Sequence, residues 1–132
     1  VSYLTPRLFT HLGIKRPTWE TDPLGNSFGA GGLFLTLSEL HKFGLFYLNK
    51  GSWNGKQILS EKWIEESTSA SDTDDYGYLF WRGEHNSFRA DGKYSQITMV
   101  LPEKNAVVSL VAECRKGEEL MRALYDLVCA KI

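Results

Sequence analysis

The chain has 132 residues, of which 42% are hydrophobic and 23% charged, and its formal net charge is −1 at pH 7. This balance is typical of a folded globular domain and argues against a disordered segment. The near-zero charge, with basic residues spread along the chain, lacks the electrostatic footprint of a nucleic-acid-binding protein. No apolar stretch approaches the ~18 residues that a membrane-spanning helix requires, so we expect no membrane span.

The first third of the chain is predicted to be mostly loop. Residues 15–32 are rich in proline and glycine, so no long regular element fits there. Residues 8–12 are interpreted as the end of a short helix, closed by Gly13 in a left-handed cap. The run 29–32 has the glycines of a phosphate-binding loop but lacks its Gly-Lys-Ser/Thr ending, so we interpret it as a tight structural turn.

Two helices are predicted in the middle of the chain. Thr36 and Glu39 match a capping box for a helix that begins at Leu37. The buried stripe of this helix is expected to contain Leu40, Phe43 and Tyr47, at helical spacing.

The second helix follows an Asn-Gly turn at Asn54 and Gly55. Ser60 can cap it, and it is predicted to run to Thr68. Residues 69–75 are small, polar and acidic. They lack the glycine and terminal glutamate of a calcium-binding loop, and we interpret them as an exposed loop without a metal.

Beyond residue 75 the pattern favours β-strands. Four strands are predicted, over residues 76–82, 87–90, 96–101 and 106–112. The short connections indicate antiparallel neighbours. The last strand is almost wholly apolar, which predicts a central strand buried on both faces.

The chain is predicted to end in a helix that begins near Gly117 and packs on the sheet. Its apolar face is expected to comprise Leu120, Leu124, Leu127 and Val128. The order of elements indicates an α+β fold, with a helical and loop region over residues 1–75 and an antiparallel sheet of three or four strands plus the terminal helix over 76–132. We expect residues 1–132 to form a single domain.

The sequence suggests neither a metal site nor a cofactor. The three histidines, at positions 11, 41 and 85, are scattered and are interpreted as surface or packing residues. Cys114 and Cys129 are too few for a disulfide framework, and two free thiols are favoured over a single disulfide. No serine begins a Ser-x-x-Lys motif.

Three segments together resemble class C β-lactamases and penicillin-binding-protein-like serine hydrolases, a largely bacterial family. They are residues 8–14, the run from Gly31 to Ser60, and Tyr76 to Trp81 followed by Gly92, Gln96 and Pro102. The order and spacing of all three, over nearly the whole chain, make the resemblance specific. It implies a partial β-lactamase-like fold, of which this chain is the C-terminal part.

The family acts through an acyl-enzyme, with three elements: Ser-x-x-Lys, Tyr-x-Asn and Lys-Thr-Gly. In family order the first two precede the segment near Leu8, so we expect them upstream of Val1 and assign no catalytic residue here. The third maps onto Ala90, Asp91 and Gly92, which we take as substrate-binding residues.

The chain departs from the family pattern at this third element. Ala90 stands where the family has a cation, and Asp91 adds negative charge. Arg89 and Lys93 flank the site, but strand alternation is expected to turn them away from the Ala90 side. Ser95 replaces a glycine that usually precedes Gln96.

Two functions stay open from the sequence. The first is part of a serine hydrolase, an esterase, amidase or peptidase acting on small molecules or peptides, inactive as this chain alone. The second is a non-catalytic binding module. With upstream packing partners missing, we also expect exposed apolar surface or an unpaired sheet edge, and hence self-association.

Overall fold

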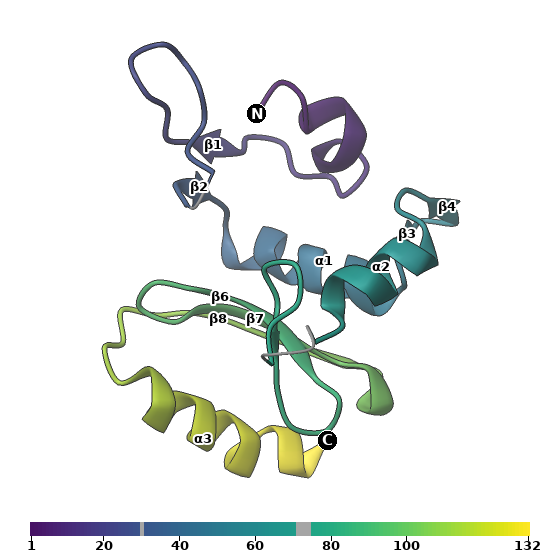
Figure 1. The fold of residues 1–132 in the computed structure, drawn as a ribbon, viewed down its shortest axis with the longest axis vertical. Coiled ribbons are helices and arrows are strands. Elements are labelled where there is room, and N and C mark those ends of the chain that lie inside the picture. Colours follow the sequence, from purple (N-terminus) through teal and green to yellow (C-terminus); the bar gives the residue numbers. More distant parts are fainter. Residues whose placement is uncertain (30, 71–74) are drawn as a thin grey trace.

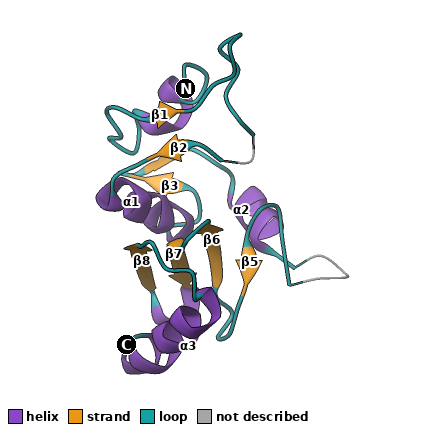
Figure 2. Cartoon of the chain, turned by 90° about the vertical axis from the view of Figure 1, so that its left-hand side faces the viewer, coloured by secondary structure: helices purple, strands orange, loops and turns teal. Residues whose placement is uncertain are grey.

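The computed structural model describes residues 1–29, 31–70 and 75–132. Its centre is a four-stranded antiparallel sheet between two helices, one on each face (Figure 1). Helix α1 (Leu37–Leu48) packs on strands β7 (Gln96–Leu101) and β8 (Ala106–Val111). Helix α3 (Gly117–Leu127) covers the opposite face, and the N-terminal segment lies beyond α1 (Figure 2). The predicted α+β class, with a terminal helix on an antiparallel sheet, is confirmed.

The N-terminal segment contains little regular structure, as predicted. A single π-helical turn, η1 (Thr5–Phe9), replaces the helix expected over residues 8–12. Gly13 adopts the predicted left-handed conformation, with φ 64°. Strands β1 (Thr18–Trp19) and β2 (Leu33–Phe34) pair antiparallel and close the intervening loop, whose residue 30 lies outside the described residues.

Helix α1 begins at the predicted cap. The Thr36 hydroxyl accepts the Glu39 backbone N–H at 3.3 Å, and the Glu39 carboxylate accepts the Thr36 backbone N–H at 2.9 Å. This second bond lowers the pKa of Glu39. The buried stripe is only partly as predicted, because Gly44, Phe46 and Tyr47 are buried while the expected Leu40 and Phe43 are half-buried.

The predicted turn and second helix are both present. Asn54 and Gly55, at φ 49° and 77°, connect β3 (Ser52–Trp53) to β4 (Lys56–Gln57). Helix α2 (Glu61–Thr68) begins after Ser60, whose hydroxyl accepts the Trp63 backbone N–H at 3.1 Å. Of the loop predicted over 69–75, residues 71–74 lie outside the described residues.

The sheet has the strand order β5-β6-β7-β8, with β5 (Trp81–Arg82) and β6 (Phe88–Gly92) preceding β7 and β8. The first predicted strand is too long, because residues 76–80 form a turn in which Leu79 has φ 67°. The prediction that the last strand is central is wrong. The central, buried strand is β7, and β8 lies at the edge, since in a meander the last strand pairs only with the one before it.

The apolar character of β8 has a different cause from the one predicted. Helices lie over both faces of the sheet, so an edge strand also contacts apolar side chains on both sides. Val107 packs in the cluster on the α1 side, whereas Val108 and Leu110 pack in the cluster on the α3 side. β8 is therefore half-buried along its length rather than fully buried.

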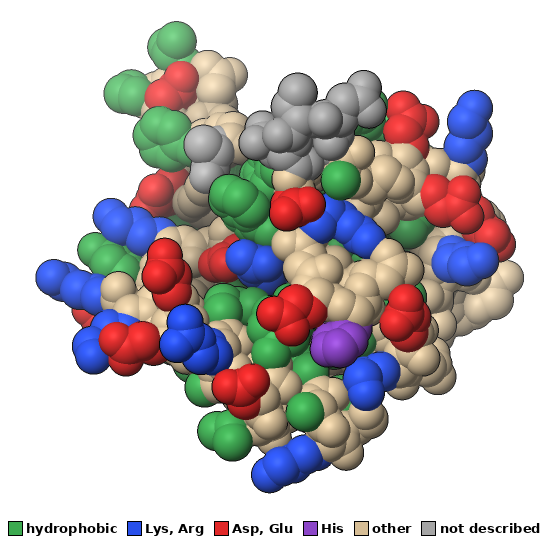
Figure 3. Space-filling view, turned by 60° about the horizontal axis from the view of Figure 1, so that its bottom comes forward, with side chains coloured by type: hydrophobic (Ala, Val, Ile, Leu, Met, Phe, Trp, Pro, Cys, Tyr) green, Lys and Arg blue, Asp and Glu red, His purple; other side chains and the backbone are tan. Residues whose placement is uncertain are grey.

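The terminal helix packs through only part of the predicted face. Leu124 is buried, and Met121 and Tyr125 contact the sheet cluster, whereas Leu127 is 61% exposed. Short 3-10 turns, η2 (Pro102–Lys104) and η3 (Cys129–Lys131), follow β7 and α3. On the face that includes α3, acidic and basic side chains are interspersed (Figure 3).

The favoured interpretation of the cysteines is confirmed, since both are free thiols. Cys129 is buried, and burial raises the pKa of its thiol, which disfavours the reactive thiolate. None of the helices in the described ranges has the length and apolar character needed to cross a bilayer.

Candidate functional site

The three residues that match the family's third element form the second half of strand β6. Ala90, Asp91 and Gly92 pair with Thr98, Ile97 and Gln96 of β7. On the other side of β6, strand β5 pairs only with Phe88 and Arg89. Within the described part of the chain, the outer edge of residues 90–92 therefore has no strand partner.

Alternation along β6 separates its side chains between the two faces of the sheet. Ala90 packs at the border of the cluster that lies under α1. Arg89 and Asp91 point to the other face, since Arg89 is paired with Met99, whose side chain belongs to the α3-side cluster. Arg89 is thus turned away from Ala90, as strand alternation predicts.

The charge of Asp91 is matched locally. Arg89 Nε donates to Asp91 Oδ2 at 3.0 Å, and both side chains are largely shielded, at 17% and 24% exposure. The Arg89 guanidinium also lies 5.9 Å from the centre of the Trp81 ring. The Lys93 ammonium lies 4.9 Å from the centre of the Tyr94 ring. The Ala90 side of the strand consequently receives no direct cation from either neighbour.

The hairpin after Gly92 is tightly built. Tyr94 and Ser95 both have left-handed backbones, with φ 62° and 70°, and the Ser95 N–H donates to the Gly92 carbonyl at 3.1 Å. A Cβ at position 92 would lie 3.3 Å from Gln96 Cβ. A left-handed φ is the conformation that glycine adopts most easily, and here Ser95 adopts it.

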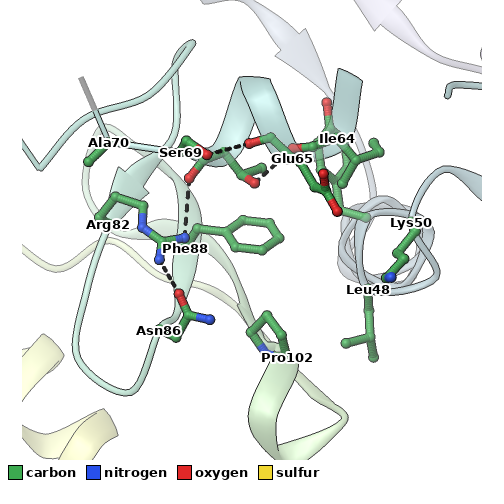
Figure 4. A pocket seen from close by; sticks show the side chains of 12 residues that line it. Leu48, Lys50, Ile64, Glu65, Ser69, Ala70, Arg82, Asn86, Phe88 and Pro102 are labelled. Atoms are coloured by element: carbon green, nitrogen blue, oxygen red, sulfur yellow. Dashed lines mark hydrogen bonds between the residues drawn. The ribbon is translucent and has the colours of Figure 1, made fainter. Parts of the chain in front are cut away.

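A cavity of about 480 Å³ lies next to this strand, between α1, α2 and the β5–β6 hairpin (Figure 4). Its walls combine apolar and charged side chains, among them Leu48, Lys50, Ile64, Arg82, Phe88 and Pro102. Tyr47 also lines it, and burial raises the pKa of that phenol, which favours its protonated form.

Three polar side chains connect α1 to the sheet. His41 Nδ1 lies 3.0 Å from Ser109 Oγ, which in turn lies 2.8 Å from Thr98 Oγ1. The predicted role of His41 as a packing histidine fits this position. In the described ranges no three His, Cys, Asp or Glu side chains gather as metal ligands would.

Comparison with known proteins gives a likeness to solved structures. No protein-family model matches the chain, and no curated protein matches it. A solved structure named as a 6-aminohexanoate-dimer hydrolase from Bacillus anthracis superposes with a TM-score of 0.81 at 21% identity, over 93% of this chain. The fold is a partial β-lactamase-like fold. At that identity the likeness shows the fold alone, and this chain spans 36% of that protein's length.

Proposed function

We propose that this chain forms the C-terminal part of a β-lactamase-like serine hydrolase domain, with residues 90–92 as one wall of its acyl site. The observation that carries the proposal is the open outer edge of β6 at these residues. The order of the three matched segments and the fold likeness to a hydrolase support it.

An open strand edge supplies the groups that acyl transfer needs beside a nucleophile. Its backbone N–H and C=O groups point outward at alternate residues, and an extended substrate can pair with them as an added strand. An outward N–H can also donate to the developing oxyanion of the reacting carbonyl. The nucleophilic serine and its base belong, in this proposal, to the upstream elements of the same domain.

The charges around Ala90 narrow the substrate class. A substrate carboxylate held at this position would need a cation, but Ala90 is uncharged and Arg89 is paired with Asp91 on the other face. The arrangement therefore favours neutral ester, amide or peptide groups over penicillin-like acids at this strand. The absence of a cation at Ala90 also favours the second candidate function, a non-catalytic module that binds peptide-like ligands beside strand β6.

Labelling with a fluorophosphonate, followed by intact-mass measurement, tests the hydrolase. On the natural polypeptide that carries this sequence we expect one covalent adduct, since such probes label an activated serine. On residues 1–132 alone we expect none. A folded natural protein without an adduct would overturn the hydrolase proposal and leave the binding module. An adduct on the 132-residue chain would place the nucleophile within it, against the proposal.

We further propose that the isolated chain self-associates through the edge of β8. The strand carries neither a charge nor a proline, the usual devices that keep an edge from pairing. Val111 at its end is 53% exposed and lines an apolar groove with Leu33, Phe34 and Leu40.

Light scattering over a range of protein concentrations tests this association. We expect the mass to rise above that of the monomer, and Val111→Lys to return it to the monomer by placing a charge at the edge. Leu127→Lys, which adds the same charge at an exposed site on α3, is the matched control and should leave association unchanged. A constant monomer mass for the unaltered chain would contradict the idea.

A further inference from the structure

The cavity between α1, α2 and the β5–β6 hairpin has the make-up of a small-molecule site. Its volume, about 480 Å³, lies within the usual range for ligand pockets. Its floor is apolar, formed by the buried side chains of Tyr47, Ile64 and Phe88. Leu48 and Pro102 also line the cavity (Figure 4). Such a floor favours an apolar chain or ring, because burying it removes apolar area from water.

One wall of the cavity carries an oriented cation. Arg82 Nη1 donates to the carbonyl of Thr68 at 3.2 Å, and Nη2 donates to the side chain of Asn86. These two bonds fix the plane of the guanidinium while leaving other N–H groups of the fork unused. In the part of the chain that the structure describes, Arg82 forms no ion pair.

The charged side chains at the lining balance in number, with Lys50 and Arg82 against Glu65 and Glu61. Lys50 on the opposite wall is shared with Glu61, outside the lining, at 3.5 Å. Glu65 is the acidic residue of the lining, against Lys50 and Arg82. Net charge therefore does not select the ligand, and the preference for an anion rests on the Arg82 guanidinium, which is held by two neutral acceptors. A guanidinium already held in place suits a carboxylate, since its planar fork can donate two parallel bonds to the two oxygens.

We propose that this cavity binds a small molecule in which a short apolar chain carries a carboxylate, with the carboxylate on Arg82 and the chain over Phe88. The site is distinct from the acyl wall, although Phe88 and Ala90 lie on the same face of β6, about 7 Å apart along the strand. It is independent of the hydrolase proposal, because binding is measured here without any reaction.

The proposal is tested by titrating the 132-residue chain with three matched probes and monitoring the NMR chemical shifts of the protein. The probes are hexanoate, 1-hexanol and hexylamine, which share the chain and differ in the head group. We expect hexanoate to shift the signals of Leu48, Ile64, Arg82 and Phe88 and to bind at least about tenfold more tightly than either other probe. Its binding should weaken with added salt.

Two variants separate the head-group contact from the apolar floor. Arg82→Gln should remove the preference for hexanoate over hexanol. Leu48→Trp keeps Arg82 but fills the cavity, and should abolish binding of all three probes. Lys116→Gln removes the same charge from an exposed position at the start of α3 and should change nothing.

Three outcomes would overturn the proposal. They are no shift at the cavity residues up to about 50 mM hexanoate, equal affinity for the three probes, or unchanged binding in Leu48→Trp. If Arg82→Gln fails to fold, Leu48→Trp and the head-group comparison in the unaltered protein still decide it.

Discussion

Replacing Phe46 by alanine is expected to lower the free energy of unfolding by about 4 kcal/mol. Phe46 has 0% exposure and belongs to the larger core cluster. That cluster joins Phe9 and Leu12 of the N-terminal segment to Ile64 of α2 and Val100 of β7. Removal of the ring leaves a cavity that these separate elements line together, so local collapse cannot easily fill it.

Denaturant unfolding of the variant, monitored by tryptophan fluorescence, measures the loss. Phe34→Ala is the matched control, because Phe34 is 58% exposed and the same atoms are removed there. We expect that variant to lose less than about 1 kcal/mol. A similar loss in both variants would mean that the chain is not organised around this cluster.

The beginnings of the helices could be predicted because local chemistry determines them. The capping box of Thr36 and Glu39 and the cap at Ser60 act within a few residues of sequence. The turn at Asn54 and Gly55 is equally local, since both residues tolerate a left-handed backbone. These elements form where the sequence indicates, and they need no knowledge of the rest of the molecule.

Which strand lies at the edge could not be predicted in the same way. An apolar run in a sequence indicates that a strand is buried on both faces, but not that it has two neighbouring strands. In β8 the helices α1 and α3 provide this burial, although only one strand pairs with it. The packing face of α3 was predicted only in part, because the sheet decides which of two adjacent apolar stripes is covered.

The sequence did not indicate that Arg82 lines a cavity, for a related reason. Arg82 faces Thr68 and Asn86 only after α2 and the β5–β6 hairpin have come together. Likewise, His41 and Ser109 are 68 positions apart in the chain, and no spacing rule connects them. By contrast, residues 90–92 were assigned from the resemblance to the family, and the structure places them in β6, of which only residues 87–90 were predicted as a strand. Their role in binding stays a prediction.

Replacing Gly44 by alanine is expected to destabilise the protein by about 2 kcal/mol, although alanine is the better helix former by about 1 kcal/mol. Gly44 is buried where α1 packs on the sheet. A Cβ there would lie 2.5 Å from Thr98 Oγ1 and 2.6 Å from Val107 Cγ1. Thr98 cannot readily rotate away, because its hydroxyl is bonded to Ser109 at 2.8 Å, and Ser109 in turn to His41.

A double-mutant cycle identifies the cause of this loss. Val107→Ala removes one of the two atoms that the new Cβ would meet, so it should cost less in the Gly44→Ala background than alone. Gly29→Ala serves as the control, since nothing lies within 4 Å of a Cβ at that position. Strict additivity of the two substitutions would mean that α1 can move away from the sheet. The close approach at Gly44 would then be a consequence of packing elsewhere and not what sets the spacing of the two layers.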